Sequence, residues 1–402
     1  MKTLDFFKLL YLIFVRSEPD LVQIQRYGLL AVKIGQILAL RPDFLGAERC
    51  RLLAQLYSHA ESLPAEDAKV LLTRCGGAQY LDHFSQFELE PFASASIGQV
   101  HRARLRSGEE VAVKLVKQDC AESFREDVGR LRNLFRWAIR FYPRLHGVAN
   151  PTTLLEQIER MTSRELDLRH EVEGGDRLEG ITQQHRARYD LSRLGFRTIY
   201  TEYSNKDLLV SEYLHGPTLD TLLSSGKLDY QSLLDLFKIH GYFLFAVGTF
   251  HGDLHPGNIV LQNGQFYFLD MAYIGHAPDH MRRGLFHFFA ALSMDDYSEA
   301  AGILNRMATV PLEGRRYLEF RKKFLALYAD FAGKTVSEVS LTRKMMQTIR
   351  MGVEAGLDFD EGMFDIIRSL MFLDGMVLRA HPNAVLLRDM RKLIADFDSY
   401  VS

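Results

Sequence analysis

Residues 251–258 read His-Gly-Asp-Leu-His-Pro-Gly-Asn, and together with the residues up to Asp270 they carry the most specific structural pattern of the chain. Two short apolar runs follow this loop, and the pair Asn263-Gly264 separates them. A type I′ turn requires positive φ at both central positions, and Asn-Gly is a favoured pair for that geometry. The pattern therefore predicts a β-hairpin that places Asn258 and Asp270 at the same end of two paired strands.

Three polar residues of this stretch suit one kind of chemistry. Asn258 and Asp270 supply the carboxamide and carboxylate oxygens that Mg²⁺ prefers as ligands. Asp253 lies one loop earlier, where a carboxylate can accept the proton of an attacking hydroxyl group. The spacing from Asp253 to Asn258 equals that of the H-R-D-x-x-x-x-N loop of protein kinases. These features predict phosphoryl transfer, whereas the simpler interpretation is a surface loop with one polar cluster. We expect His251 and His255 to shape the loop rather than to bind a metal.

The composition is that of an ordinary globular protein with a large core. The chain has 402 residues, of which 47% are hydrophobic and 25% charged. Its net charge of −2 gives no field that would recruit nucleic acid non-specifically. Cys50, Cys75 and Cys120 form no CxxC pair and are odd in number, so we expect a reducing, cytoplasmic compartment with no disulfide and no cysteine-bound metal.

The N-terminal residues resemble a signal peptide only in part. The apolar run 9–15 follows Lys2 and Lys8, but the polar segment 16–20 follows it in place of a small-residue cleavage site. No run of 18 apolar residues exists, so no transmembrane helix is predicted. We expect an apolar first helix that docks on the protein; the alternative is peripheral contact with the inner membrane surface.

Residues 21–90 carry apolar side chains near helical spacing, so this whole region is predicted to be helical. Gly35 falls inside the pattern, between Lys33 and Gln36, although interior glycine costs a helix about 1 kcal/mol relative to alanine. One interpretation is that another segment approaches closely, with both polar side chains reaching across. The other is a solvated helix face, and spacing alone favours this second interpretation.

A strand-rich segment begins near residue 87 and ends with Val111-Ala-Val-Lys114. In this pattern the strand lysine, here Lys114, reaches the phosphates of a nucleotide. A loop of small residues precedes it, and its short side chains would let backbone N–H groups approach phosphate oxygens. The loop should be stiffer than a glycine-rich one. It consists of Ala93, Ser94, Ala95 and Ser96.

A helix predicted to begin at residue 150 contains three acids, Glu165, Asp167 and Glu171. One acid from this region should pair with Lys114, as a helix glutamate does in kinases. On spacing alone, the same acids are more typical of a solvated face.

Residues 195–203 and 207–213 are predicted to form a hairpin-like pair of strands, and a glycine-bearing linker follows them. Such a linker suits a hinge whose backbone, near Glu212 and Leu214, hydrogen-bonds adenine. Beyond it the chain is predicted to be largely helical, over 217–225, 229–250 and 279 to the end.

Taken together, these residues resemble the aarF/UbiB family of atypical kinases. Four blocks carry the resemblance: Lys33-Ile-Gly-Gln36, Ala93–His101, Glu165-Leu-Asp167 with Glu171, and His251–Asp270. The resemblance implies an α+β, protein-kinase-like fold with two lobes and Mg-ATP bound between them. It divides the chain into a helical N-terminal extension (1–86), a β-rich N-lobe with a helical insertion (87–214) and a helical C-lobe (215–402).

The same resemblance implies a role for each site residue. The extension would fold over the active site, with Lys33 paired to Glu165, while Glu171 pairs with Lys114. The alanine-rich loop would stand where kinases carry their glycine-rich loop. Family members are similar to ATPases, or to kinases of lipid-like molecules, that support isoprenoid quinone metabolism at membranes and do not phosphorylate proteins in trans.

One departure from the family pattern concerns the metal segment, which reads Asp270-Met-Ala272 instead of Asp-Phe-Gly. Met271 can fill the site of the phenylalanine because it is flexible and apolar. Ala272 lacks the φ freedom of glycine, which should restrict movement of the segment. Two alternative functions remain: a phosphotransferase of the aminoglycoside or choline kinase type, and a nucleotide-binding, lipid-interacting scaffold with little catalysis.

Overall fold

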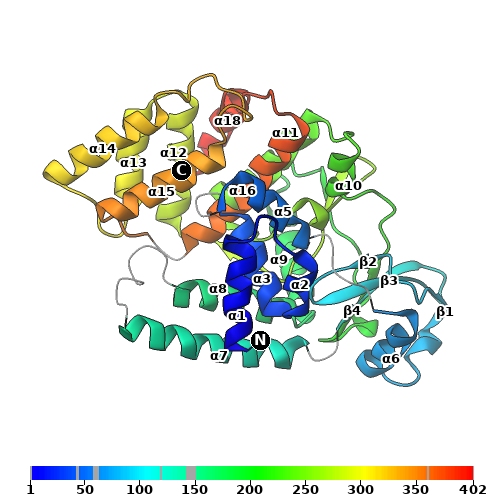
Figure 1. Ribbon diagram of the computed structural model, residues 1–402. Coiled ribbons are helices and arrows are strands. Elements are labelled where there is room, and N and C mark those ends of the chain that lie inside the picture. Colours follow the sequence, from blue (N-terminus) through cyan, green and yellow to red (C-terminus); the bar gives the residue numbers. More distant parts are fainter. Residues whose placement is uncertain are drawn as a thin grey trace. The chain divides into compact units, whose positions relative to one another are not determined.

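The computed structural model describes residues 2–41, 45–57, 63–117, 120–141, 151–359 and 362–401 (Figure 1). The chain forms two compact units. Unit 1 comprises residues 1–181, 196–216 and 270–273, and unit 2 comprises residues 182–195, 217–269 and 274–402. No helix in the described ranges combines the length and apolarity needed to cross a membrane.

A five-stranded antiparallel sheet organises unit 1. Its strands follow the order β1-β3-β4-β6, and the short β2 pairs with the start of β3, on the edge that β1 occupies farther along the strand. The strands are β1 (Phe84–Phe87), β2 (Ala93–Ser94), β3 (Gly98–Leu105), β4 (Glu110–Val116) and β6 (Leu208–Glu212). Apolar residues on one face of the sheet, such as Val111 and Val113, form a core with α6 (Ala65–Gly76). Lys114 lies on β4 opposite Leu209 of β6.

Helices make up the rest of unit 1. They are α1 (Thr3–Phe14), α2 (Leu21–Arg26), α3 (Leu29–Ala39), α5 (Ala47–Leu53), α7 (Cys120–Phe141), α8 (Pro151–Glu165) and the start of α9 (Arg169–His185), with α1, α2 and α3 drawn in dark blue in Figure 1. The first helix docks as predicted, because Phe6, Leu9, Leu12 and Ile13 are buried. Phe6 lies edge-on to Phe135 of α7, with ring centroids 5.7 Å apart.

Unit 2 is mainly helical. Its helices are α10 (Leu219–Ser224), α11 (Tyr230–Gly241), α12 (Asp279–Ser293), α13 (Tyr297–Met307), α14 (Gly314–Tyr328), α15 (Leu341–Ala355), α16 (Gly362–Ala380), α17 (Leu386–Asp389) and α18 (Arg391–Val401). A π-helical segment, η5 (Tyr242–Val247), follows α11 directly. Two small sheets contain β7 (Thr249–His251) with β10 (Ile274–His276), and β5 (Leu194–Gly195), β9 (Gln265–Phe268) and β8 (Ile259–Gln262).

The hairpin predicted from Asn263-Gly264 is confirmed. β8 and β9 pair antiparallel, with Gln262 opposite Gln265 across a two-residue turn. Asn263 and Gly264 have φ values of 52° and 79°, the positive values that a type I′ turn requires. Two-residue turns fix the register of the strands they join, so local chemistry determines this part of unit 2.

Three predicted elements differ from the structure. Residues 21–90 are not all helical, because β1 occupies 84–87. The helix predicted to run through Glu171 is two helices, since Leu168 donates its N–H to Lys206 O, which interrupts the helical hydrogen bonds between α8 and α9. Residues 195–203 are not one strand: residues 194 and 195 pair with β9, Ile199 forms a single bridge to Ser211, and 201–203 is a 3₁₀ turn.

Candidate functional site

A buried ion cluster surrounds Lys114 in unit 1. Its Nζ lies 2.7 Å from Glu171 Oε2 and 3.2 Å from Asp270 Oδ1. The other oxygen of Glu171 accepts a hydrogen bond from Arg197 Nη2. Glu171 is fully buried on α9, so one carboxylate connects the strand lysine with an arginine that the sequence pattern did not single out. The ion pair predicted between Lys114 and Glu171 is therefore present.

The cluster keeps Lys114 charged. Burial alone would lower the pKa of this amine, but the carboxylates of Asp270 and Glu171 outweigh burial and raise it above its ordinary 10.5. Lys114 is thus a fixed cation at any physiological pH. A fixed, largely desolvated cation is suited to bind a polyanion such as a nucleotide phosphate chain, because Coulomb attraction is strong where water is scarce.

The helix α3 brings Lys33 to Glu165, at the end of α8, and the two form a buried ion pair. Gly35 allows close packing, because a Cβ at this position would lie 2.5 Å from Leu56 Cδ1. Gln36 is buried, and its Nε2 donates to Leu56 O at 2.9 Å. The solvated helix face favoured by spacing alone is therefore wrong, and the pairing implied by the family resemblance is present.

Hydrogen bonds within the small-residue loop and from Lys117 stabilise its conformation. The N–H of Ala95 donates to Gly98 O at 2.8 Å, so this donor is already committed. Lys117 Nζ donates to Ser94 Oγ at 3.2 Å and to Ala95 O at 3.0 Å. Ala93 pairs with Val100 of β3. The loop therefore has a defined geometry and a lysine of its own; that Ala93, Ser94, Ala95 and Ser96 bind phosphate stays a prediction.

Three other predicted residues lie outside the Lys114 cluster. The carboxylate of Asp167 binds Arg169, with 2.6 Å between Oδ2 and Nη2, in the turn between α8 and α9. Glu212 ends β6, and its Oε2 accepts the N–H of Thr198 at 3.1 Å. Leu214 follows the strand by two residues and is half-buried. Adenine binding by the backbone of this linker stays a prediction.

The segment Asp270–Ala272 is held tightly within unit 1. Asp270 has φ of 51°, in the left-handed region that non-glycine residues rarely adopt. Met271 is buried, and a Cβ on Gly175 of α9 would lie only 3.0 Å from its Cε. Arg164 Nε donates to Ala272 O at 2.9 Å. Such strain persists only where surrounding contacts hold it, and here α8 and α9 supply them.

The loop 251–258 has its own network within unit 2. His251 Nε2 lies 2.9 Å from the carbonyl oxygen of Leu269, and the N–H of Asp253 donates to His251 Nδ1 at 3.0 Å. The ring is therefore the neutral Nε2–H tautomer with both nitrogens engaged, so it shapes the loop and has no nitrogen available for a metal. His255 plays a similar part, because its Nδ1 accepts the N–H of Gly257 at 3.0 Å.

Two further contacts fix the polar residues of this loop. Asn258 Nδ2 donates to Asp253 O at 3.2 Å, which orients the carboxamide and directs its oxygen away from that contact. Arg368 of α16 donates from Nη2 to Gly252 O at 2.7 Å. This arginine is 2% exposed. Fully buried arginines are rare, so we expect this one to be retained for its hold on the residue next to Asp253.

The donor set available for a metal consists of oxygens. In the described ranges no group of three or more His, Cys, Asp or Glu side chains could enclose an ion. Asn258 in unit 2 and Asp270 in unit 1 offer one hard oxygen donor each, which suits Mg²⁺, since this ion usually keeps waters and substrate phosphates as its other ligands. A shared Mg²⁺ stays a prediction.

The motif residues could be identified from the sequence, but the arginines that contact them could not. Arg197 and Arg368 contact Glu171 and Gly252 from 26 and 116 residues away along the chain. No local pattern marks such partners. Lys117 is the exception, because a lysine three residues after Lys114, beside a small-residue loop, could have been noticed.

Comparison with known proteins shows which proteins the chain is similar to. The ABC1 atypical kinase-like domain matches residues 55–304 of the chain. Proteins described as probable protein kinase UbiB from Pseudomonas paraeruginosa PA7 and Pseudomonas aeruginosa LESB58 are each 27% identical over 375 residues, which cover 89% of this chain and 67% of theirs. A structure of the Rv3197–erythromycin complex from Mycobacterium tuberculosis aligns with a TM-score of 0.56 and 20% identity over 92% of both chains. The predicted protein-kinase-like α+β fold is confirmed.

Proposed function

Because this chain belongs to the ABC1 family of atypical kinases, of the UbiB type, we propose that it binds Mg-ATP and transfers the γ-phosphoryl group to water or to a small lipid-like acceptor. The observation that carries the proposal is the buried amine of Lys114, held by Glu171 and Asp270. One carboxylate would be enough to neutralise a structural lysine, whereas Lys114 contacts two, Glu171 and Asp270. In the nucleotide complex the ammonium group of Lys114 would interact with phosphate oxygens as well as with Asp270.

Each residue of the site has one task in this reaction. Lys114 orients the phosphates, and Glu171 holds Lys114. Asp253 accepts the proton of the acceptor hydroxyl, or positions the attacking water. The bond between the γ-phosphorus and its bridging oxygen breaks, a bond from phosphorus to the acceptor oxygen forms, and ADP leaves. Asn258 and Asp270 would hold Mg²⁺, which neutralises charge on the phosphate oxygens.

The acceptor is inferred from what surrounds Glu165. The buried pair of Lys33 and Glu165 ties the N-terminal extension to α8. In a protein kinase the peptide substrate needs open access to the site, and we infer that a tied extension favours water or a small molecule instead. Together with the family, this supports a role in isoprenoid quinone or lipid metabolism.

Support for peripheral membrane contact comes from α1. While one face of this helix is buried, the opposite face exposes apolar side chains, among them Phe7 at 56% and Phe14 at 43%. Leu4 and Tyr11 share that face, and the exposed Lys8 lies at its edge. Helices with aromatic and aliphatic residues on one exposed face are typical of membrane-interface binding.

The test uses nucleotide binding and turnover together. Lys114→Met should abolish binding of a fluorescent ATP analogue in the presence of Mg²⁺. Asp253→Asn should keep that binding and lower turnover by about 100-fold or more, which is the usual contribution of a positioned acid or base. Lys227→Met, at an exposed lysine, is the matched control and should behave as wild type.

The acceptor is tested in the same assay. Phospholipid vesicles, phenolic quinone precursors, amino alcohols, aminoglycosides and a generic protein substrate are each added to wild-type protein. Stimulation by vesicles or phenols supports the proposal. Rapid phosphorylation of the amino alcohols or aminoglycosides would replace it with a small-molecule kinase, and wild-type turnover equal to that of Asp253→Asn would leave only a scaffold.

A further inference from the structure

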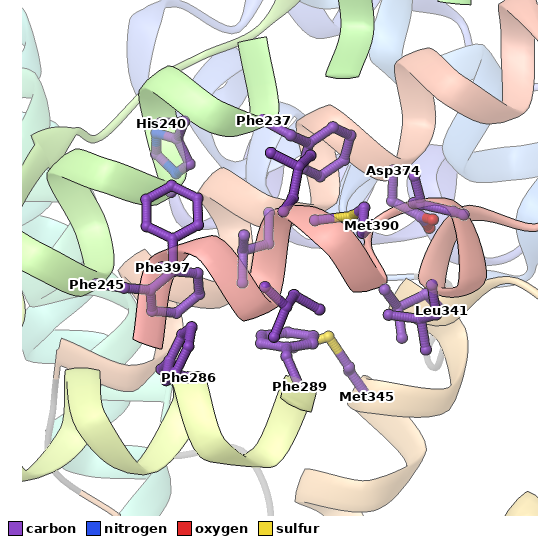
Figure 2. A pocket seen from close by; sticks show the side chains of 16 residues that line it. Phe237, His240, Phe245, Phe286, Phe289, Leu341, Met345, Asp374, Met390 and Phe397 are labelled. Atoms are coloured by element: carbon purple, nitrogen blue, oxygen red, sulfur yellow. The ribbon is translucent and has the colours of Figure 1, made fainter. Parts of the chain in front are cut away.

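Unit 2 encloses an apolar cavity of about 50 Å³ that the proposed reaction does not use (Figure 2). Five phenylalanines, two methionines and six leucine or isoleucine residues line it, and the three remaining lining residues are His240, Gly241 and Asp374. The lining comes from α11, η5, α12, α15, α16, α17 and α18, so seven segments converge on one void. Such a lining gives water few partners and favours an apolar occupant.

The polar members do not change this character. His240 is completely buried in the helical core; its Nε2 is hydrogen-bonded to Ser369 Oγ at 3.0 Å, and burial lowers its pKa to about 3, which leaves the ring neutral. Asp374 is 4% exposed, and its Oδ2 accepts from Ser340 Oγ at 3.3 Å. An anion would find no cationic side chain among the lining residues, and the only carboxylate among them, Asp374, already binds Ser340, so the lining favours an uncharged ligand.

The cavity is too small to hold more than a few atoms. An engineered apolar cavity of roughly 150 Å³ accepts benzene, and this one is about a third of that size. A ligand larger than a few atoms requires the wall to move. Met345 and Met390 supply part of the wall, and methionine side chains adapt easily because they are unbranched and flexible. A slender chain demands the least widening.

Two connections join the cavity wall to the loop 251–258. The first follows the chain: Gly241 lines the cavity where α11 changes to the π-helix η5, and η5 leads through Gly248, with φ of 77°, into β7 and His251. Short π-helical segments often occur at functional sites. The second connection passes through α16, because His240 binds Ser369 and the neighbouring Arg368 holds Gly252 O.

We propose that this cavity is the closed state of a binding site for a slender, uncharged apolar molecule, and that occupancy shifts the loop carrying Asp253. The binding half of the proposal is independent of the proposed function, and the regulatory half rests on it. α18 contributes Leu393, Ile394 and Phe397 to the wall, and in this proposal it is the helix that moves when the site opens.

The test observes methionine methyl groups by NMR while 1-hexanol is added to the full chain without nucleotide. The ε-methyl resonances of Met345 and Met390 should shift saturably, whereas that of Met294, which is 68% exposed, should not. Leu393→Phe fills the cavity and should abolish the shifts. Leu304→Phe, at a buried leucine of α13 outside the cavity, is the matched control and should keep them. If Leu393→Phe does not fold, Leu370→Phe replaces it.

ATP turnover is then measured with and without 1-hexanol. We expect a change of about fivefold in wild type and in Leu304→Phe, the lower end of usual allosteric coupling, and none in Leu393→Phe. Absence of saturable shifts, or equal shifts in Leu393→Phe, would show an inert packing void and overturn the proposal. Shifts with unaltered turnover overturn the regulatory half. A chain without any turnover that still shows the shifts refutes the proposed function and leaves the binding site standing.

Discussion

At the scale of single residues, Glu171 decides how the charged cluster is balanced. Its two oxygens serve two cations, Lys114 and Arg197, and its side chain is fully buried. Removing one member of a buried ion network is costly because the remaining charges lose their compensation. The arrangement thus links stability to the residue that orients the proposed nucleotide-binding lysine.

We expect Glu171→Gln to lower the free energy of unfolding by about 3 kcal/mol, because Arg197 loses its carboxylate and Lys114 keeps only Asp270. Urea denaturation followed by circular dichroism measures this change. Glu173→Gln, two residues away and exposed, should cost less than about 0.5 kcal/mol. Equal effects in the two variants would contradict a buried network.

Arg368 is a positioning residue for the loop, since it binds Gly252 O and not a substrate. Arg368→Met should lower kcat about tenfold or more while the KM for ATP stays within about twofold, because misplacement affects the reacting geometry most. Arg368→Lys should restore part of kcat. A parallel loss in kcat and in nucleotide affinity would indicate a general folding defect instead.

The sequence was sufficient to predict those residues whose partners are set by local spacing or by a family pattern. Lys114 and Asp253 belong to short motifs, so they could be found without coordinates. Arg197 and Arg368 act through contacts between segments far apart in the chain, and an arginine outside a motif looks like any solvated arginine. Their roles required the structure.

At the scale of elements, the turn of a hairpin was easier to predict than the point at which a helix is interrupted. The hairpin of β8 and β9 follows from Asn263-Gly264, because backbone φ at a two-residue turn is a local property. The break between α8 and α9 depends on the bond from Leu168 to Lys206 O, a tertiary contact that no helical periodicity contains. The division at residues 86 and 214 stays a prediction.

The two faces of α1 make a prediction of their own. Phe7→Ser combined with Phe14→Ser should lower the fraction of protein that cosediments with phospholipid vesicles, reducing the partition coefficient about tenfold or more. The buried face of α1 is untouched, so the melting temperature should stay the same. Val310→Ser with Leu318→Ser, at apolar residues of unit 2 that are each 62% exposed, is the matched control. Equal loss in the control would remove α1 as the contact.

At the scale of the whole molecule, His240 sets a limit on stability in acid. Its pKa falls from 6.5 to about 3 mainly because the ring is buried, and a charge on the nearby His251 would lower it further. Below pH 6.5 the unfolded chain binds a proton at this position and the folded chain does not. Stability is therefore fully present above pH 6.5 and decreases as pH falls towards 3.

At pH 5 the buried neutral ring of His240 lowers the free energy of unfolding by about 2 kcal/mol relative to neutral pH. The pH lies about 1.5 units below 6.5, and each unit corresponds to about 1.36 kcal/mol. We expect the difference in unfolding free energy between pH 7 and pH 5 to shrink by about that amount in His240→Gln. Urea titrations at both pH values measure it. His280→Gln, at an exposed histidine of α12, should leave the difference unchanged, and an equal effect there would contradict this account.

The end of α8 carries one last consequence. Glu165 holds Lys33 of α3, and its neighbour Arg164 holds Ala272 O beside Asp270. Consecutive helical positions point about 100° apart, so the ion pair of Glu165 and the hydrogen bond of Arg164 lie on different sides of one helix. Inserting a single amino acid anywhere between 152 and 163 would rotate the side chains of Arg164 and Glu165 about the helix axis, and both contacts would be lost together. The length of this helix should therefore tolerate evolutionary change far less than its surface composition does.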